Sequence, residues 1–306
     1  MNVTAMWKVC LHCVLIATAT LGANQVGSAP SDRRALTDLA YLGDGHERHM
    51  LDLFVPKAHR PVPLIVWLHG GGWMRGSKSS HPMLAFAKSF VDDGFAVASI
   101  NYRLSSHATF PAQLEDCRAA VRWLYSNAGK FGIDPTRIAI IGQSAGGFLA
   151  ALLGTSGDIE NVVNDRGTVT GVRRARAIVD FFGPTDFLQI DRHQLPGGEV
   201  ADSPDSPESR LIGGPIQERR TEVAKSSPLT YVSSDDPPFL IFHGDQDLTV
   251  PHHQSELLYS ALRTAGVPAQ FHTVQGAGHS GPAFTTPEIR RLVREFLNDT
   301  LGTPSP

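Results

Sequence analysis

The stretch that decides the fold is Gly142-Gln143-Ser144-Ala145-Gly146, a G-x-S-x-G pattern. It directly follows a strand-like apolar run and directly precedes an apolar segment of helical length. A serine placed between a buried strand and a helix sits on a tight, strained turn that pushes its hydroxyl out above the sheet. The flanking glycines leave room for this crowded turn, and the helix N-terminus adds a positive dipole. The pattern predicts that Ser144 is a nucleophile.

Outward from this turn, short apolar runs alternate with segments of helical length. Continuous apolar runs of four to eight residues suit strands that are buried on both faces, as in a parallel sheet covered by helices. The expected strands are 39–42, 50–55, 63–68, 95–102, 137–141, 177–182, 238–242 and 269–274, and the expected helices are 81–92, 111–128, 144–153, 252–265 and 287–301. This alternation predicts an α/β fold with a doubly wound, mostly parallel sheet of eight strands, an antiparallel start and helices on both faces.

Residues 191–228 break the alternation. They are rich in Pro, Ser, Gly and charged residues, with short helical pieces such as 216–225. Excursions of this length tend to be lids or binding loops. We expect a lid-like insertion here, and a surface insertion without function is the alternative.

A second glycine-rich segment, His69-Gly-Gly-Gly-Trp73, directly follows an expected strand. Attack of a serine on an ester creates a tetrahedral intermediate with a negative oxygen, and backbone N–H groups must already face that oxygen. We assign Gly71 and Gly72 as donors, with the N–H of Ala145, the residue after the nucleophile, completing the oxyanion hole. The N–H of Trp73 competes for one of these places. A phosphate loop is disfavoured because no Lys-Ser/Thr pair follows.

Two later loops supply candidates for the base and the acid. His243-Gly-Asp245-Gln-Asp247 and the glycine-flanked His279 each follow an expected strand, at the edge where open α/β sheets gather their active groups. His279 is the expected base, because imidazole titrates near neutral pH. The rival His272 falls within an expected strand, a position typical of a packed side chain. Asp245 and Asp247 compete as the acid, and spacing alone does not separate them.

The composition argues against several other classes of protein. The chain has 306 residues, with 27 basic and 30 acidic side chains and no Lys/Arg stripe, so nucleic acid is not an expected partner. His252 and His253 resemble a metal-binding pair, but they lie at a helix start without a surrounding ligand cluster. We expect no metal and no cofactor. Cys117 lies at the spacing of a buried helix face, which predicts a core thiol.

The first residues resemble an export signal. Lys8 provides a positive start, residues 9–21 form an apolar run too short to span a membrane, and small residues precede Pro30. We therefore expect a signal peptide at 1–29, a single catalytic domain at 30–306, and a secreted or periplasmic protein without a membrane span in its mature chain.

These motifs together resemble α/β-hydrolase esterases of the bacterial feruloyl and acetylxylan esterase type (BD-FAE-like), close to hormone-sensitive-lipase-like enzymes. The resemblance runs from about residue 41 to residue 297. It rests on the segments 69–73, 99–103, 110–116, 142–147, 181–186, 206–214, 243–247 and 250–251. It implies that the second Asp of the His-Gly-Asp-x-Asp loop, Asp247, is the acid. Gln143 departs from the small residue that many relatives carry beside the nucleophile.

The expected activity is the hydrolysis of carboxylic esters through an acyl-enzyme on Ser144. The resemblance implies short-chain acyl, aryl or cell-wall polysaccharide esters, acetyl and feruloyl among them, as substrates. Trp73 and Gln143 are expected to contact the substrate, with packing beneath the oxyanion loop as the alternative for Trp73. An amidase of the kynurenine formamidase type, a peptidase relative and a non-catalytic binding module are the other readings of this fold.

Overall fold

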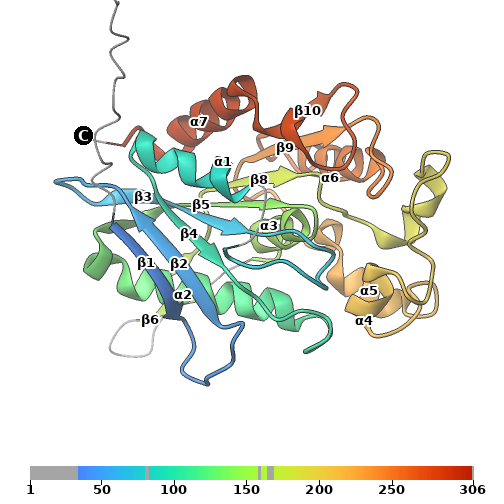
Figure 1. The fold of residues 1–306 in the computed structure, drawn as a ribbon, viewed down its shortest axis with the longest axis horizontal. Helices are drawn as coiled ribbons and strands as arrows, with labels where there is room; N and C mark the ends of the chain where they lie inside the picture. Colours follow the sequence, from blue (N-terminus) through green and yellow to red (C-terminus); the bar gives the residue numbers. More distant parts are fainter. Residues whose placement is uncertain (1–33, 80–82, 158–159, 164–168, 305–306) are drawn as a thin grey trace, which may run out of the picture. The chain divides into compact units, whose positions relative to one another are not determined.

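The structure is built on one eight-stranded sheet with the strand order β1-β2-β4-β3-β5-β8-β9-β10 (Figure 1). The computed structural model describes residues 34–79, 83–157, 160–163 and 169–304, and the expected signal peptide at 1–29 lies outside them. The strands are β1 (Arg34–Ala40), β2 (Met50–Val55), β3 (Val62–Leu68), β4 (Ala96–Ile100), β5 (Ile133–Gln143), β8 (Ala177–Phe181), β9 (Phe239–Gly244) and β10 (Ala269–Val274).

The sheet starts antiparallel and continues parallel. β2 is antiparallel to both β1 and β4, and every later pair in the sheet is parallel. Parallel strands place all their carboxyl ends at one edge, so the loops after β3, β5, β9 and β10 meet there. The expected α/β-hydrolase architecture is therefore confirmed.

The first strand differs from the expectation. The sequence favoured 39–42, whereas β1 spans Arg34–Ala40 and its register with β2 shifts between Leu36 and Leu39. β1 is an edge strand in which five of the seven residues are exposed and the other two are partly buried, so it carries no continuous apolar run. The six-residue strands β2 and β10 coincide with their expected ranges, and each is bounded at one end by a proline, Pro56 after β2 and Pro268 before β10.

Helices cover the sheet in two layers (Figure 1). One hydrophobic cluster joins one face of the sheet to α2, α3 and α6, and a second joins the other face to α1 and α7. The helices are α1 (Leu84–Ser89), α2 (Ala112–Phe131), α3 (Ala145–Thr155), α4 (Pro207–Ile212), α5 (Arg220–Ser226), α6 (His253–Thr264) and α7 (Pro287–Leu301). Cys117 of α2 is fully buried in the first cluster, as expected for a core thiol.

Two features lie outside the alternating pattern. β6 (Glu160–Val163) and β7 (Val169–Arg173) form a separate antiparallel pair that was not among the expected strands. Residues 191–228 contain a short 3₁₀ turn, α4 and α5, linked by irregular backbone. Within the described ranges, no helix has the length and apolar character that crossing a bilayer would require.

Candidate active site

The turn between β5 and α3 holds Ser144 in a strained backbone conformation. Its φ is 52° and its ψ is −124°, a region that residues with a side chain rarely adopt. A hydrogen bond of 2.8 Å from the Ser144 N–H to the carbonyl of Phe181 on the neighbouring strand β8 stabilises this conformation. A Cβ on Gly142 would collide with the carbonyl of Gly146, so the turn requires glycine there.

Replacing Gly142 by Ala is expected to lower the free energy of unfolding by at least about 2 kcal/mol, because the added methyl group overlaps the backbone of the turn. Gly129→Ala is the matched control. Gly129 lies within α2 with nothing within 4 Å of its Cβ position, so the same substitution should be neutral or slightly stabilising there. Urea unfolding measures both, and equal effects would contradict this account of the turn.

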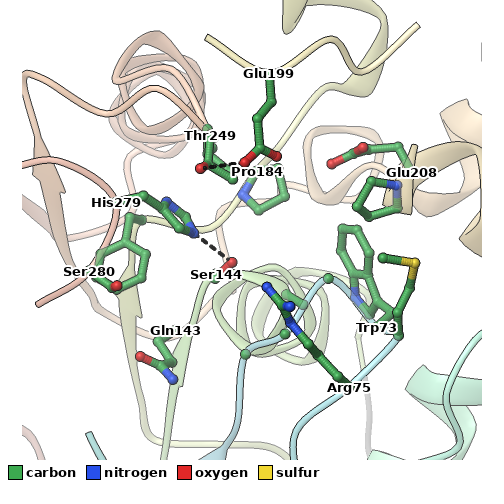
Figure 2. A pocket seen from close by; sticks show the side chains of 18 residues that line it. Trp73, Arg75, Gln143, Ser144, Pro184, Glu199, Glu208, Thr249, His279 and Ser280 are labelled. Carbon is green, nitrogen blue, oxygen red and sulfur yellow. Dashed lines mark hydrogen bonds between the residues drawn. The ribbon is translucent and has the colours of Figure 1, made fainter. Parts of the chain in front are cut away.

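Three side chains from separate loops form a continuous hydrogen-bonded chain. The Ser144 Oγ lies 2.9 Å from His279 Nε2, and His279 Nδ1 lies 2.7 Å from Asp247 Oδ2 (Figure 2 shows the first of these). Because Nδ1 faces a carboxylate, it carries the proton, which leaves Nε2 free to accept a proton from Ser144. The structure thus brings the predicted nucleophile, base and acid together, in the order that proton transfer requires.

Asp247 is fully buried and accepts several hydrogen bonds. Oδ1 accepts from the N–H groups of Thr249 and Val250 at 2.8 and 2.9 Å, and Oδ2 accepts from His279 and also from His243 at 3.1 Å. Burial acts to raise the pKa of Asp247, but the hydrogen bonds from His243 and His279 outweigh it and hold this pKa below the ordinary range. Asp247 is therefore ionised at neutral pH and can stabilise an imidazolium at His279.

The rival residues occupy supporting positions. Asp245 accepts a hydrogen bond of 2.6 Å from the N–H of Gly276 and so braces the loop that carries His279. His272 lies on β10 and stacks on the ring of Phe242 at 5.3 Å between centroids. Neither side chain is part of the hydrogen-bonded chain to Ser144.

The loop after β3 is held in a conformation that only glycine adopts without strain. Gly71 and Gly72 have φ values of 117° and 59°, and both line the pocket above Ser144. His69 fixes the start of the loop through a hydrogen bond of 2.8 Å from its Nδ1 to the carbonyl of Gly70. Ala145 is the first residue of α3, so its N–H has no preceding helical carbonyl to bond. The structure therefore places Gly71, Gly72 and Ala145 around the same pocket as Ser144.

Trp73 and Gln143 both line the pocket but are almost entirely buried. The Trp73 ring packs edge-on against Phe148 at 5.1 Å and lies 5.6 Å from Phe187. Most of the Trp73 side chain is therefore packed in the core beneath the glycine loop after β3. Such packing was the alternative to substrate contact for this residue.

Comparison with known proteins shows the family of this chain. The BD-FAE family model matches residues 51–262, well over half of the chain. The chain belongs to the BD-FAE family.

Curated relatives of this BD-FAE chain include two esterases from Mycobacterium tuberculosis (strain ATCC 25618 / H37Rv). Esterase LipQ is 29% identical over 276 residues, which is 87% of this chain and 62% of LipQ. Esterase LipC is 30% identical over 224 residues, which is 72% of this chain and 53% of LipC. The chain thus spans less than two thirds of the length of each.

Solved structures share the same fold. A truncated carbohydrate esterase from gut microbiota has a TM-score of 0.77 and 32% identity, with 87% of this chain and 96% of that chain covered. An acetyl ester-xyloside bifunctional hydrolase from Caldicellulosiruptor lactoaceticus has a TM-score of 0.70 and 25% identity, with 88% and 97% covered. The predicted resemblance to α/β-hydrolase esterases of this type is confirmed.

The BD-FAE pocket around Ser144 encloses about 250 Å³ and includes residues that sequence reasoning missed. Phe182 packs edge-on against the His279 imidazole at 4.9 Å. Arg75, Glu199 and Glu208 add charged groups to the pocket wall (Figure 2). Phe182 directly follows β8, at the same sheet edge as Ser144 and His279. Its position at the end of a strand was the one sequence signal that could have indicated a place in the pocket. Glu199 and Glu208 lie in the segment 191–228 that was expected to be a lid or binding loop, but no pattern singled out either residue or Arg75.

Asp180 lies buried beneath the Ser144 turn. It pairs with Gly142 across β8 and β5, and a Cβ on Gly147 or Gly183 would touch its carboxyl oxygen. Burial raises the pKa of Asp180 to about 7, although a hydrogen bond from the Gly183 N–H opposes this. The neutral carboxylic acid is therefore the favoured form of this group in the folded protein below about pH 7.

The raised pKa of Asp180 predicts a pH-dependent contribution to stability. Because the folded state holds this proton more tightly, the contribution is complete below the unfolded pKa of about 4 and is lost as pH rises through about 7. The wild type should therefore lose stability relative to Asp180→Asn as pH rises from 4 to 8. Urea unfolding of both proteins across this range measures the difference, and a constant difference would contradict the assignment.

Proposed function

We propose that this BD-FAE chain is a serine esterase in which Ser144, His279 and Asp247 hydrolyse carboxylic esters through an acyl-enzyme. The observation that carries the proposal is the unbroken hydrogen-bonded chain from the Ser144 hydroxyl through His279 to the buried carboxylate of Asp247. It opens onto a pocket that the glycine loop after β3 also lines. The names of relatives such as LipQ support the same activity.

In the acylation step, Ser144 attacks the ester carbonyl while His279 Nε2 takes the hydroxyl proton. Asp247 holds the imidazole in the correct tautomer and stabilises its positive charge. The N–H groups of Gly71, Gly72 and Ala145 face the oxygen that becomes negative, where such donors contribute most to lowering the barrier. The imidazolium then gives its proton to the leaving alcohol, and the acyl group remains on Ser144.

Deacylation repeats this chemistry with water. His279 takes a proton from a water molecule that attacks the acyl-enzyme, and the proton then returns to Ser144 as the carboxylic acid leaves. The part-exposed edge of His279 gives water a route to the bond, because 18% of this side chain is accessible to solvent while Asp247 is fully covered.

For the substrate, we propose short-chain acyl esters, including acetyl esters of cell-wall polysaccharides. A cavity of about 250 Å³ is at the small end for ligand pockets and favours small acyl groups. The carbohydrate esterase and the acetyl ester-xyloside hydrolase among the solved relatives support a sugar as the alcohol component.

A panel of 4-nitrophenyl acetate, 4-nitrophenyl butyrate, a feruloyl ester, acetylated xylan and N-formylkynurenine tests this proposal. We expect kcat/KM to fall from acetyl to feruloyl, with acetate released from the xylan. Faster turnover of N-formylkynurenine than of the aryl acetate would instead indicate an amidase.

We also propose that residues 1–29 direct export and are removed. Amino-terminal sequencing of protein secreted by a bacterial host tests this, and a mature chain that begins at Pro30 is the expected result. Retention of the apolar run 9–21 would contradict it.

A further inference from the structure

Three charged side chains face the pocket, and the proposed catalytic steps use none of them. Arg75 comes from the loop after β3, and Glu199 and Glu208 come from the insertion 191–228. Within the part of the chain that the structure describes, none of the three forms an ion pair. Arg75 and Glu199 are exposed to solvent, whereas Glu208 is largely buried. Because removing a charge from water without a charged partner costs free energy, Glu208 is the strongest candidate for a ligand contact.

Glu208 is the most constrained of the three. Only 9% of Glu208 is exposed to solvent, yet its carboxyl group lies at the pocket (Figure 2). The preceding Pro207 packs against the oxyanion loop, since a Cβ on Gly72 would lie 3.1 Å from it. Burial, with the nearby charge of Glu199, raises the pKa of Glu208 to about 7 against the opposing effect of its own backbone N–H. Glu208 is thus a largely buried polar group in the wall of the pocket that Ser144 also lines.

Glu199 lies on the same side of the pocket as Glu208 (Figure 2). Its Oε1 accepts a hydrogen bond of 3.2 Å from the Thr249 hydroxyl, and its N–H donates to the carbonyl of Leu248 at 2.7 Å. Both contacts fix it to the loop that carries Asp247. A carboxylate has about four acceptor sites, so this one retains capacity for a ligand.

Arg75 provides the complementary group. In Figure 2 its guanidinium is drawn below the level of Ser144, and the carboxyl groups of both glutamates are drawn above it. Two carboxyl groups alone would suit a cationic ligand, and a guanidinium alone would suit an anionic one. A hydroxyl group both donates and accepts hydrogen bonds. A neutral ligand with several hydroxyls can therefore donate to the two carboxyl groups and accept from the Arg75 guanidinium.

We propose that Glu208 and Glu199, together with Arg75, form a subsite that binds free hydroxyl groups of the ester substrate and selects acetylated sugars over simple alkyl esters. The inference rests on the proposed esterase function and adds the residues that determine its alcohol specificity. It also gives the insertion 191–228 a role in recognition, because both glutamates come from it.

Two acetate esters with rings of similar size test the proposal. Methyl mono-O-acetyl-β-D-xylopyranoside carries free hydroxyls, whereas cyclohexyl acetate has none. The measured quantity is the ratio of kcat/KM for the sugar ester to kcat/KM for cyclohexyl acetate. For Glu208→Gln we expect this ratio to fall by about 10-fold, because one strong acceptor becomes a donor. Glu199→Gln should lower it in the same direction.

Glu218→Gln is the matched control. Glu218 lies in the same insertion and is exposed, and it is not among the residues that line the pocket, so the same charge change should leave the ratio at the wild-type value. Circular dichroism establishes that each variant is folded. If Glu208→Gln does not fold, the exposed Glu199 decides the outcome through its own variant.

The outcomes separate the inference from the function on which it rests. A lower ratio in the pocket variants but not in Glu218→Gln supports the subsite. An unchanged ratio in folded variants that still hydrolyse both esters through Ser144 overturns the subsite and leaves the esterase function standing. Preference of the wild type for a cationic ester, acetylthiocholine, over the sugar ester also overturns it. Failure of the wild type to cleave any ester overturns both proposals.

Discussion

Ser144→Ala is expected to lower kcat for 4-nitrophenyl acetate by about 10⁴- to 10⁶-fold, to the level that binding and the oxyanion hole alone provide. The hydroxyl is the only group within hydrogen-bonding distance of His279 Nε2 among the described residues, so no other nucleophile can replace it there. Stopped-flow measurement should show loss of the burst of 4-nitrophenol that accompanies acylation.

Ser260→Ala is the control for this substitution. Ser260 is exposed on α6, far in sequence from the turn, and its replacement should leave kcat within about two-fold, as is usual for surface positions. Mass spectrometry after treatment with an organophosphonate gives an independent readout, because the wild type should gain one covalent phosphonyl group and Ser144→Ala none. Turnover retained by the alanine variant would reject Ser144 as the nucleophile.

Asp247→Asn is expected to lower kcat by about 10⁴-fold with little change in the fold of the site. An amide can still accept the N–H groups of Thr249 and Val250, but it no longer carries the charge that orients and stabilises the His279 imidazolium. Asp245→Asn is the matched comparison. The amide oxygen of this variant can still accept a hydrogen bond from the N–H of Gly276, so its kcat should fall by less than about 10-fold. The reverse order of effects would make Asp245 the acid.

The lowered pKa of Asp247 gives the same variant a signature in stability. A carboxyl group whose folded pKa lies below its unfolded value stabilises the protein above the unfolded pKa of about 4, and this contribution is lost as pH falls through the folded value. The wild type should therefore exceed Asp247→Asn in unfolding free energy at pH 7, and the difference should shrink below about pH 4. A difference that grows on acidification would contradict the assignment.

Local sequence patterns were sufficient for the elements whose signals are local. Proline is disfavoured inside a strand, so Pro56 directly after β2 and Pro268 directly before β10 helped to place these two strands to the residue. The Ser144 turn was equally visible, because a strained backbone with close contacts requires glycines at fixed spacing. The edge strand β1 was misplaced, since its exposed residues carry no such pattern.

The sequence by itself predicted the doubly wound sheet and singled out Ser144 as the candidate nucleophile and His279 as the candidate base, because each of these predictions depends on residue types at short spacing. Only the tertiary structure separated the two aspartates by geometry, with Asp247 on His279 and Asp245 on the N–H of Gly276. It alone placed Glu208 in the wall of the pocket that Ser144 also lines. Contacts between segments far apart in the chain depend on how whole elements pack, and no local pattern encodes that packing.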